Sequence, residues 1–172
     1  MKVARVILTT DCNFNCSYCC NKLPEVQTKF KMTTIRDLVK MPYDVFNLTG
    51  GEIGLTTLKL VSAIYGIKLV NPKAEIYLYT NGKLRPWDFG QPSRDAISGI
   101  NVGFHPETDI DKIRVRLSDY IYYGLKPRVH IEDTRWESID KEFKIFLERN
   151  NIPVKLWTRG QCMNDNEDWW IV

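Results

Sequence analysis

The chain has 172 residues, with 24 Lys and Arg against 21 Asp and Glu, so its formal net charge is +3. This length fits one domain that buries a core without disulfides or structural metal, and the scattered basic residues give no reason to expect a nucleic-acid partner. The apolar run before Thr9 is too short for a signal sequence or a membrane span, so we expect a cytoplasmic protein without a membrane partner.

Runs of apolar and β-branched residues alternate along the chain with runs of helical spacing. Pro86, Gly90 and Pro92 leave room for one short helix at most in residues 83–98. In chain order we predict a strand at 3–8, a helix at 34–40 with Thr33 as its cap, a strand at 45–48, a helix at 57–68, strands at 75–79 and 99–104, a helix at 111–123, a strand at 127–131, a helix at 137–149 and a strand at 154–157.

This alternation predicts an α/β fold with parallel strands and right-handed crossovers. A complete eight-fold barrel takes about 250 residues. Six strands therefore predict a partial (β/α)6 barrel, a truncated TIM-barrel-like fold that is open on one side. We expect one domain over residues 1–172, with 159–172 as a C-terminal tail, and ligands at the carboxyl ends of the strands.

Four of the five cysteines, Cys12, Cys16, Cys19 and Cys20, lie within nine residues, directly after the first predicted strand, and Cys162 lies far from them. Clustered thiols without an export signal indicate metal or redox chemistry rather than a disulfide framework. Three ligands from a C-x3-C-x2-C loop would leave one iron of a [4Fe-4S] cluster open, by analogy with catalytic zinc sites. A zinc site on Cys12, Cys16, Cys19 and Cys20 is the alternative. We favour Cys20 as a bystander and Cys162 as a buried small side chain.

Two further strand ends carry polar motifs. The second predicted strand runs into Gly50, Gly51 and Glu52, where glycines allow close approach of a ligand and a carboxylate can accept hydrogen bonds from an ammonium group. The third ends in Thr80-Asn81-Gly82. Asn-Gly is also a hairpin signal, but the prolines after it make a poor partner strand.

Together, the Cys12-x3-Cys16-x-Tyr18-Cys19 loop, Gly50-Gly51-Glu52 and Thr80-Asn81-Gly82 resemble the radical S-adenosylmethionine superfamily, over roughly residues 3–132. The resemblance implies a small single-cluster enzyme. In it, Cys12, Cys16 and Cys19 ligate a [4Fe-4S] cluster, and the open iron chelates the methionine part of S-adenosyl-L-methionine. Reductive cleavage then yields a 5′-deoxyadenosyl radical that abstracts hydrogen from an organic or peptide substrate.

By the same resemblance, Tyr18 lies near the adenine and the segment of Gly50, Gly51 and Glu52 contacts the methionine ammonium, with Asn81 as a further cofactor contact. The candidates at the later strand ends have no clear motif match. They are His105, His130 and Glu132. His105 can equally be a strand-end cap and His130 a hydrogen-bonded core histidine. No catalytic residue is assigned beyond the cluster ligands.

The substrate stays open, because superfamily membership determines the initiating chemistry and not the target. The first strand is similar to members that modify peptides or build heterocyclic cofactors, whereas the small size is similar to glycyl-radical-enzyme activases and 7-carboxy-7-deazaguanine synthases. An electron donor such as flavodoxin or ferredoxin is implied. The open barrel side predicts a bulky substrate or a protein partner.

A different class is also open, a non-catalytic cysteine-metal interaction module that docks through its acidic, aromatic tail. In that tail, acidic residues precede Trp169 and Trp170. The tail can serve as a docking peptide or fold back over a barrel edge, and we favour folding back because two tryptophans in water would promote aggregation.

Overall fold

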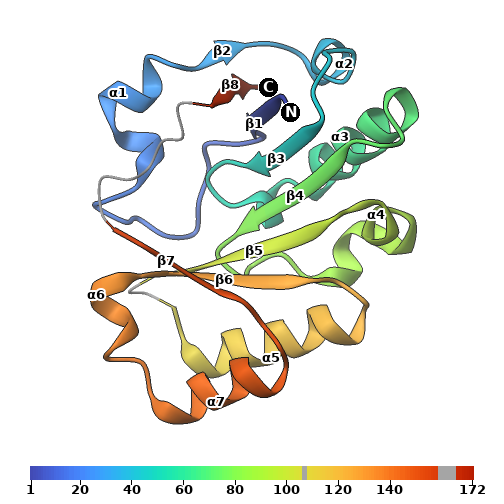
Figure 1. The fold of residues 1–172 in the computed structure, drawn as a ribbon. Helices are drawn as coiled ribbons and strands as arrows, with labels where there is room; N and C mark the ends of the chain where they lie inside the picture. The colour runs from blue at the N-terminus through green and yellow to red at the C-terminus, as the bar shows by residue number, and fades with distance from the viewer. Residues whose placement is uncertain (106–107, 159–165) are drawn as a thin grey trace.

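The computed structural model describes residues 1–105, 108–158 and 166–172 and contains one curved sheet with helices packed along it (Figure 1). Within these residues the sheet has eight strands in the order β2-β8-β1-β3-β4-β5-β6-β7, and every pairing is parallel. The strands are β1 Val3–Ile7, β2 Lys31–Met32, β3 Val45–Thr49, β4 Glu75–Thr80, β5 Gly99–Phe104, β6 Pro127–Glu132, β7 Val154–Trp157 and β8 Glu167–Ile171.

The sheet does not close, because β2 and β7 are its two edges. This confirms the open α/β architecture expected from the sequence. All six predicted strands are present, and two more were missed. The first, β2, has two residues. The second, β8, lies inside the sheet between β1 and β2.

The end of the chain folds back, as favoured above. Strand β8 pairs with β1 in parallel, with Glu167 opposite Val3. Trp169 is buried against Ile7 and Val26, so the tryptophan is removed from water as expected. Cys162 and the rest of the tail at 159–165 lie outside the described residues.

The helical segments connect successive strands. They are η1 Cys20–Lys22, α1 Pro24–Gln27, α2 Ile35–Leu38, η2 Ile53–Leu55, α3 Thr57–Val70, η3 Pro86–Phe89, α4 Gly90–Ala96, α5 Ile110–Tyr122, α6 Asp133–Trp136 and α7 Lys141–Arg149. Residues 83–98 hold one short α-helix, α4, after a 3-10 turn. None of the helices in the described ranges is long and apolar enough to cross a membrane.

Three helix starts differ from the prediction; α5 begins one residue earlier, at Ile110. Helix α2 begins after Thr34 rather than Thr33, because the Thr34 hydroxyl accepts a hydrogen bond from the Asp37 amide at 3.2 Å. Helix α7 begins later than predicted, because Asp140 caps it by accepting from the Phe143 amide at 2.7 Å. The residues before that cap form the separate helix α6.

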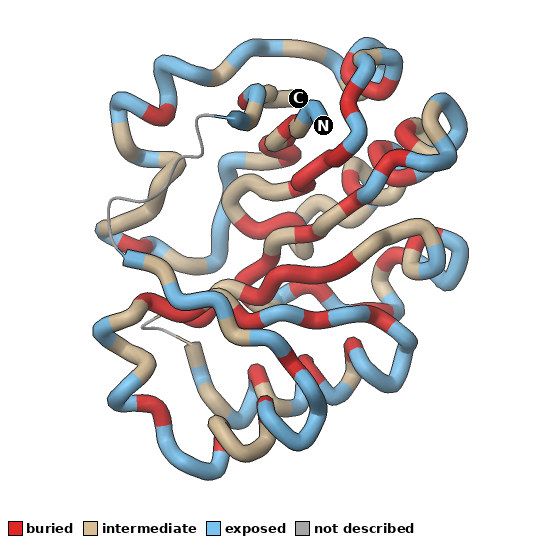
Figure 2. Tube along the Cα trace, viewed as in Figure 1, coloured by how far each residue is buried: buried red, intermediate tan, exposed pale blue. Residues whose placement is uncertain are grey.

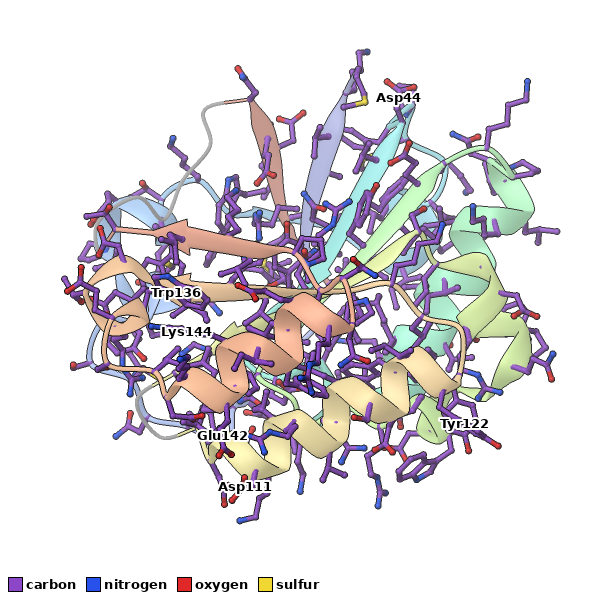
Figure 3. All side chains as sticks on the ribbon, turned by 60° about the horizontal axis from the view of Figure 1, so that its bottom comes forward. Asp44, Asp111, Tyr122, Trp136, Glu142 and Lys144 are labelled. Atoms are coloured by element: carbon purple, nitrogen blue, oxygen red, sulfur yellow. The ribbon has the colours of Figure 1, made fainter. Side chains whose placement is uncertain are left out.

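The main core lies between the sheet and the helices (Figure 2). Along each central strand, alternate side chains are apolar and fully buried, among them Val6, Leu48, Leu78, Val102 and Ile131. Burying each such side chain stabilises the fold by about 1.5–3 kcal/mol. In the outer layer α5 and α7 lie side by side, and the Lys144 ammonium lies 4.9 Å from the ring centroid of Trp136 (Figure 3).

Candidate functional site

The cysteine loop follows β1 at the carboxyl edge of the sheet. Cys12, Cys16 and Cys19 form no disulfide and are respectively exposed, buried and half-buried. Cys20 is disulfide-bonded, so it has no thiol to offer a metal. The three thiols all line one cavity of about 630 Å³. The structure therefore brings the three predicted ligands to one cavity.

The three thiols suit a cluster by their chemistry, because thiolates are the ligands that iron–sulfur clusters prefer. Across the residues that the structure describes, no three His, Cys, Asp or Glu side chains are gathered closely enough to hold a metal ion. That finding concerns a single ion. The thiolates of a [4Fe-4S] cluster bind separate irons, so they lie farther apart than the ligands of one ion.

Polar groups already surround two of these sulfurs. The Phe14 amide donates to the Cys12 sulfur at 3.4 Å, and the Asn81 side-chain amide approaches it at 3.7 Å. The His105 Nδ1 atom lies 3.7 Å from the Cys16 sulfur. Donors to a thiolate stabilise its negative charge and tune the potential of a cluster that it holds.

Gly50 and Gly51 allow the chain after β3 to pack directly against the start of the loop. The Gly51 amide donates to the Thr9 carbonyl at 2.7 Å. A Cβ atom on Gly51 would lie 2.0 Å from the Asp11 carbonyl oxygen, and one on Gly50, where φ is +147°, would lie 2.3 Å from the Thr9 oxygen. Only glycine fits this contact. Both glycines also line the cavity.

Glu52 faces away from the cavity. Its carboxylate is fully buried and accepts hydrogen bonds from the Thr80 hydroxyl at 2.7 Å, the Asn81 amide at 2.6 Å and the Gly54 amide at 2.8 Å. Burial raises the pKa of the Glu52 carboxyl, and these three donors oppose the rise. The carboxylate thus joins the end of β3 to the end of β4. Of the predicted segment, the two glycines line the cavity and Glu52 does not.

Asn81 lies on the cavity wall, at the point that Glu52 holds in place. Its side-chain amide donates to the Asn13 side-chain oxygen at 3.0 Å, within the cysteine loop. Its own oxygen accepts from the Lys83 amide at 3.2 Å. Asn81 therefore links the end of β4 to the loop that carries the thiols.

Aromatic rings form one side of the cavity. Tyr18 stacks on His105 with 6.2 Å between ring centroids, and its hydroxyl lies 3.2 Å from His105 Nδ1. The rings of Tyr18 and Trp157 are 6.1 Å apart, and Phe14 meets His105 edge to face at 5.7 Å. Such a wall offers flat apolar surface to a purine ring.

His130 lies deeper on the concave face and lines the same cavity. Its Nε2 atom lies 3.1 Å from the Asn101 side-chain oxygen. The pKa of His130 is lowered to about 4, chiefly by burial and then by the nearby cations Lys155, Arg5 and Arg128. The ring is therefore neutral at pH 7 and donates to Asn101 through Nε2–H.

Glu132 is buried, and its side chain is not part of this cavity's lining. The structure instead adds Asn101, Trp157 and Arg5, which the sequence analysis did not select. Arg5 and Asn101 lie at strand positions that alternate with apolar core residues, whereas Trp157 ends β7 next to Leu156, which is 45% exposed. That alternation was visible in the sequence, but it does not by itself distinguish a cavity wall from a solvated face.

A buried ion pair supports the cavity from β1 and β8. Arg5 Nε lies 2.6 Å from Glu167, which also accepts from the Asn47 side-chain amide at 2.9 Å. The guanidinium carbon of Arg5 lies 4.8 Å from the ring centroid of Tyr79 and 5.2 Å from that of Trp169. The charge of Arg5 is thus compensated within the protein.

Neither a protein-family model nor a curated protein sequence matches the chain. Its fold is similar to that of anSMEcpe with bound AdoMet, with a TM-score of 0.64 and 15% identity over 91% of this chain and 51% of that one. SuiB from Streptococcus suis bound to S-adenosylmethionine has a TM-score of 0.58 and 12% identity over 99% of this chain and 47% of its own.

Both of these structures hold bound S-adenosylmethionine. The chain spans about half the length of either one. At these identities the likeness concerns the fold, and it confirms the fold that the motif resemblance implied.

Proposed function

We propose that this chain is a radical S-adenosylmethionine enzyme, with a [4Fe-4S] cluster on Cys12, Cys16 and Cys19. One observation carries the proposal. The three thiols of a C-x3-C-x2-C loop line one cavity with Gly50 and Gly51, at the carboxyl edge of a fold shared with proteins solved with bound AdoMet. The cavity, about 630 Å³, lies within the usual size range for small-molecule sites.

When bound, the cluster supplies the electron that cleaves the carbon–sulfur bond of S-adenosylmethionine, giving methionine and a 5′-deoxyadenosyl radical. The chain positions S-adenosylmethionine and excludes water from it. Gly50 and Gly51 line the part of the cavity that receives the methionine moiety in this proposal; the Gly51 amide donates to the Thr9 carbonyl, and the Gly50 carbonyl accepts from the Asn21 side chain at 2.7 Å. The rings of Tyr18 and Trp157 provide the surface for the adenine and exclude water from it.

In this proposal Glu52 is a positioning residue rather than a contact of the methionine ammonium. Its carboxylate holds the Thr80 hydroxyl and the Asn81 amide, and Asn81 in turn contacts the cysteine loop. The substrate is an organic molecule or a peptide from which hydrogen is abstracted, and the electron donor is a protein such as flavodoxin or ferredoxin. Activation of a glycyl-radical enzyme and a 7-carboxy-7-deazaguanine synthase-like reaction are the alternatives within this chemistry.

The test is anaerobic reconstitution with iron and sulfide, then reduction by dithionite in the presence of S-adenosylmethionine. We expect about four irons per chain and formation of 5′-deoxyadenosine. Bound zinc, with neither iron uptake nor cleavage, would instead support the non-catalytic metal module. Cys20→Ala should retain the iron, because Cys20 contributes no free thiol.

A further inference from the structure

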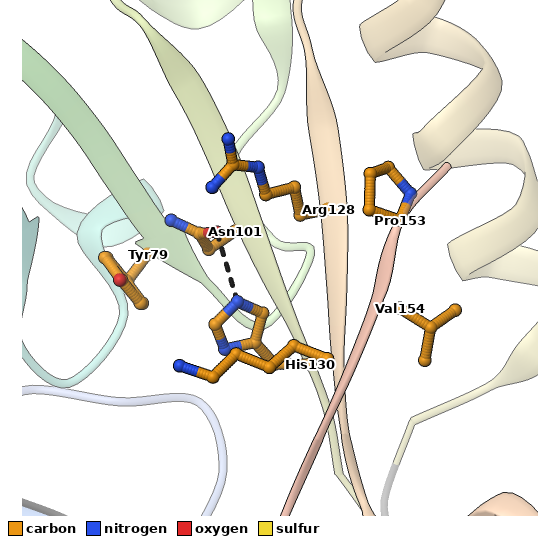
Figure 4. A pocket seen from close by; sticks show the side chains of 7 residues that line it. Tyr79, Asn101, Arg128, His130, Pro153 and Val154 are labelled. Atoms are coloured by element: carbon orange, nitrogen blue, oxygen red, sulfur yellow. Dashed lines mark hydrogen bonds between the residues drawn. The ribbon is translucent and has the colours of Figure 1, made fainter. Parts of the chain in front are cut away.

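A second cavity, of about 410 Å³, adjoins the first on the concave face of the sheet (Figure 4). Tyr79, Asn101 and His130 line both cavities, so they form the boundary between them. Beyond this boundary the second cavity is lined by Arg128 of β6 and Lys155 of β7. A molecule in the second cavity would therefore lie next to whatever occupies the first.

The second cavity is positively charged. None of its lining side chains within the described residues is acidic, whereas Arg128 and Lys155 are cations. Neither of the two forms an ion pair with any residue that the structure describes. The guanidinium carbon of Arg128 lies 5.4 Å from the ring centroid of Tyr77.

Two carboxylates on other strands of the sheet are already engaged. Glu75 accepts a hydrogen bond from the Tyr77 hydroxyl at 2.7 Å, and Glu167 is paired with Arg5 at 2.6 Å. The positive potential at the cavity is also felt by His130, whose protonated form it disfavours. The cavity thus presents two cations without a compensating carboxylate in its lining.

The neutral groups at the boundary complete a set of donors. Because the Asn101 oxygen accepts from His130 Nε2 at 3.1 Å, its amide nitrogen is left to donate to a ligand (Figure 4). Guanidinium, ammonium and amide donors together are the groups that recognise carboxylate or phosphate oxygens. S-adenosylmethionine carries a sulfonium cation, so its charged sulfur is not favoured beside Arg128 and Lys155.

We infer that the second cavity binds an oxyanion, a carboxylate or a phosphate, of a small substrate. The inference rests on the proposed function, because it places the body of the substrate toward the cavity of the cysteine loop. It narrows the substrate class to small organic acids or phosphorylated compounds.

Binding is tested on the chain without its cluster, so that the result does not depend on radical chemistry. Glutarate, its neutral counterpart glutaramide and inorganic phosphate are titrated while the imidazole signals of His130 and the side-chain amide of Asn101 are followed by NMR. We expect glutarate or phosphate to shift these signals saturably and glutaramide to bind at least tenfold more weakly. The stronger of the two anions identifies the group.

Two variants and their controls locate the binding. Arg128→Gln and Lys155→Gln should each weaken anion binding about tenfold or more, the loss of one charge-assisted contact. Arg149→Gln and Lys141→Gln remove the same charges from the exposed surface of α7 and should leave binding unchanged.

The inference would be overturned if glutaramide bound as tightly as glutarate, or if neither anion gave a saturable shift. It would also be overturned if the control variants lost as much anion affinity as Arg128→Gln and Lys155→Gln. Cleavage of S-adenosylmethionine without anion binding would contradict this inference alone. Anion binding without cleavage would contradict the proposed function alone.

Discussion

The two faces of the sheet have opposite chemistry. On the face toward the helices the strands present Val6, Leu78 and Val102, all fully buried in one apolar core. On the concave face the alternate positions of the same strands present polar groups such as Arg5 and Asn101. One face therefore stabilises the fold and the other is available for binding. Predictions that separate the two faces test this division directly.

The largest effect is expected from Cys16→Ser. Removing one of three thiols should abolish iron uptake and the formation of 5′-deoxyadenosine, because the remaining two cannot hold the cluster. The loop lies outside the main core, so we expect the free energy of unfolding of the cluster-free chain to change by less than about 1 kcal/mol. Iron analysis, product assay and denaturant unfolding measure these quantities. Retained cleavage would refute the ligand assignment.

The next largest effect on stability is expected within a matched pair of substitutions on adjacent strands. Leu78→Ala on the helix side should lower the free energy of unfolding by about 2–5 kcal/mol, the usual cost of truncating a buried leucine. Asn101→Ala on the concave side should cost about 1 kcal/mol through its lost hydrogen bond to His130. Urea unfolding of both variants compares them. A similar cost for the two would contradict the division between the faces.

A smaller loss of stability is expected from Glu52→Ala, because this substitution leaves three hydrogen-bond donors without their acceptor. We expect the free energy of unfolding to fall by about 2–3 kcal/mol. Glu52→Gln should recover part of this loss, since its amide oxygen still accepts. If the cofactor were bound directly by the carboxylate, cleavage would fall while stability stayed the same, and thermal unfolding beside the cleavage assay distinguishes the two cases.

The smallest effect concerns pH. The pKa of His130 is lowered to about 4, against 6.5 in an unfolded chain. Between these values the unfolded state binds a proton that the folded state does not, so stability falls as pH drops from 6.5 toward 4. We expect a loss of about 1–2 kcal/mol in the free energy of unfolding between pH 6.5 and about pH 5, and His130→Asn should flatten this dependence. With two histidines in the chain, NMR titration can follow each ring separately.

Strands with a clear period of two were predictable from the sequence, whereas pairings that depend on distant partners were not. Strand β2 has two residues, too few to show any period. Strand β8 begins with acidic residues, and it forms because Arg5 and Asn47 bind Glu167 from strands far away in sequence. Its position inside the sheet could not be derived locally.

In the candidate site, too, some residues were predictable from the sequence and others depend on distant partners. Contiguous motifs located Cys12, Cys16 and Cys19 and the two glycines at one cavity. The orientation of Glu52 was not predictable, because it depends on donors at the end of another strand. Asn101 and Trp157 were missed because single polar or aromatic residues within strands carry no motif. Tertiary contacts determine which of them face the cavity.

The pairing of β8 with β1 has a consequence for the order of events during synthesis. β1 leaves the ribosome long before β8, one of its two neighbours in the sheet, is translated. Contacts between residues so far apart in sequence form slowly. Until then one edge of β1 has no strand beside it, and its hydrogen-bonding groups can recruit other nascent chains. Chaperone demand and expression yield should therefore respond strongly to substitutions in β8.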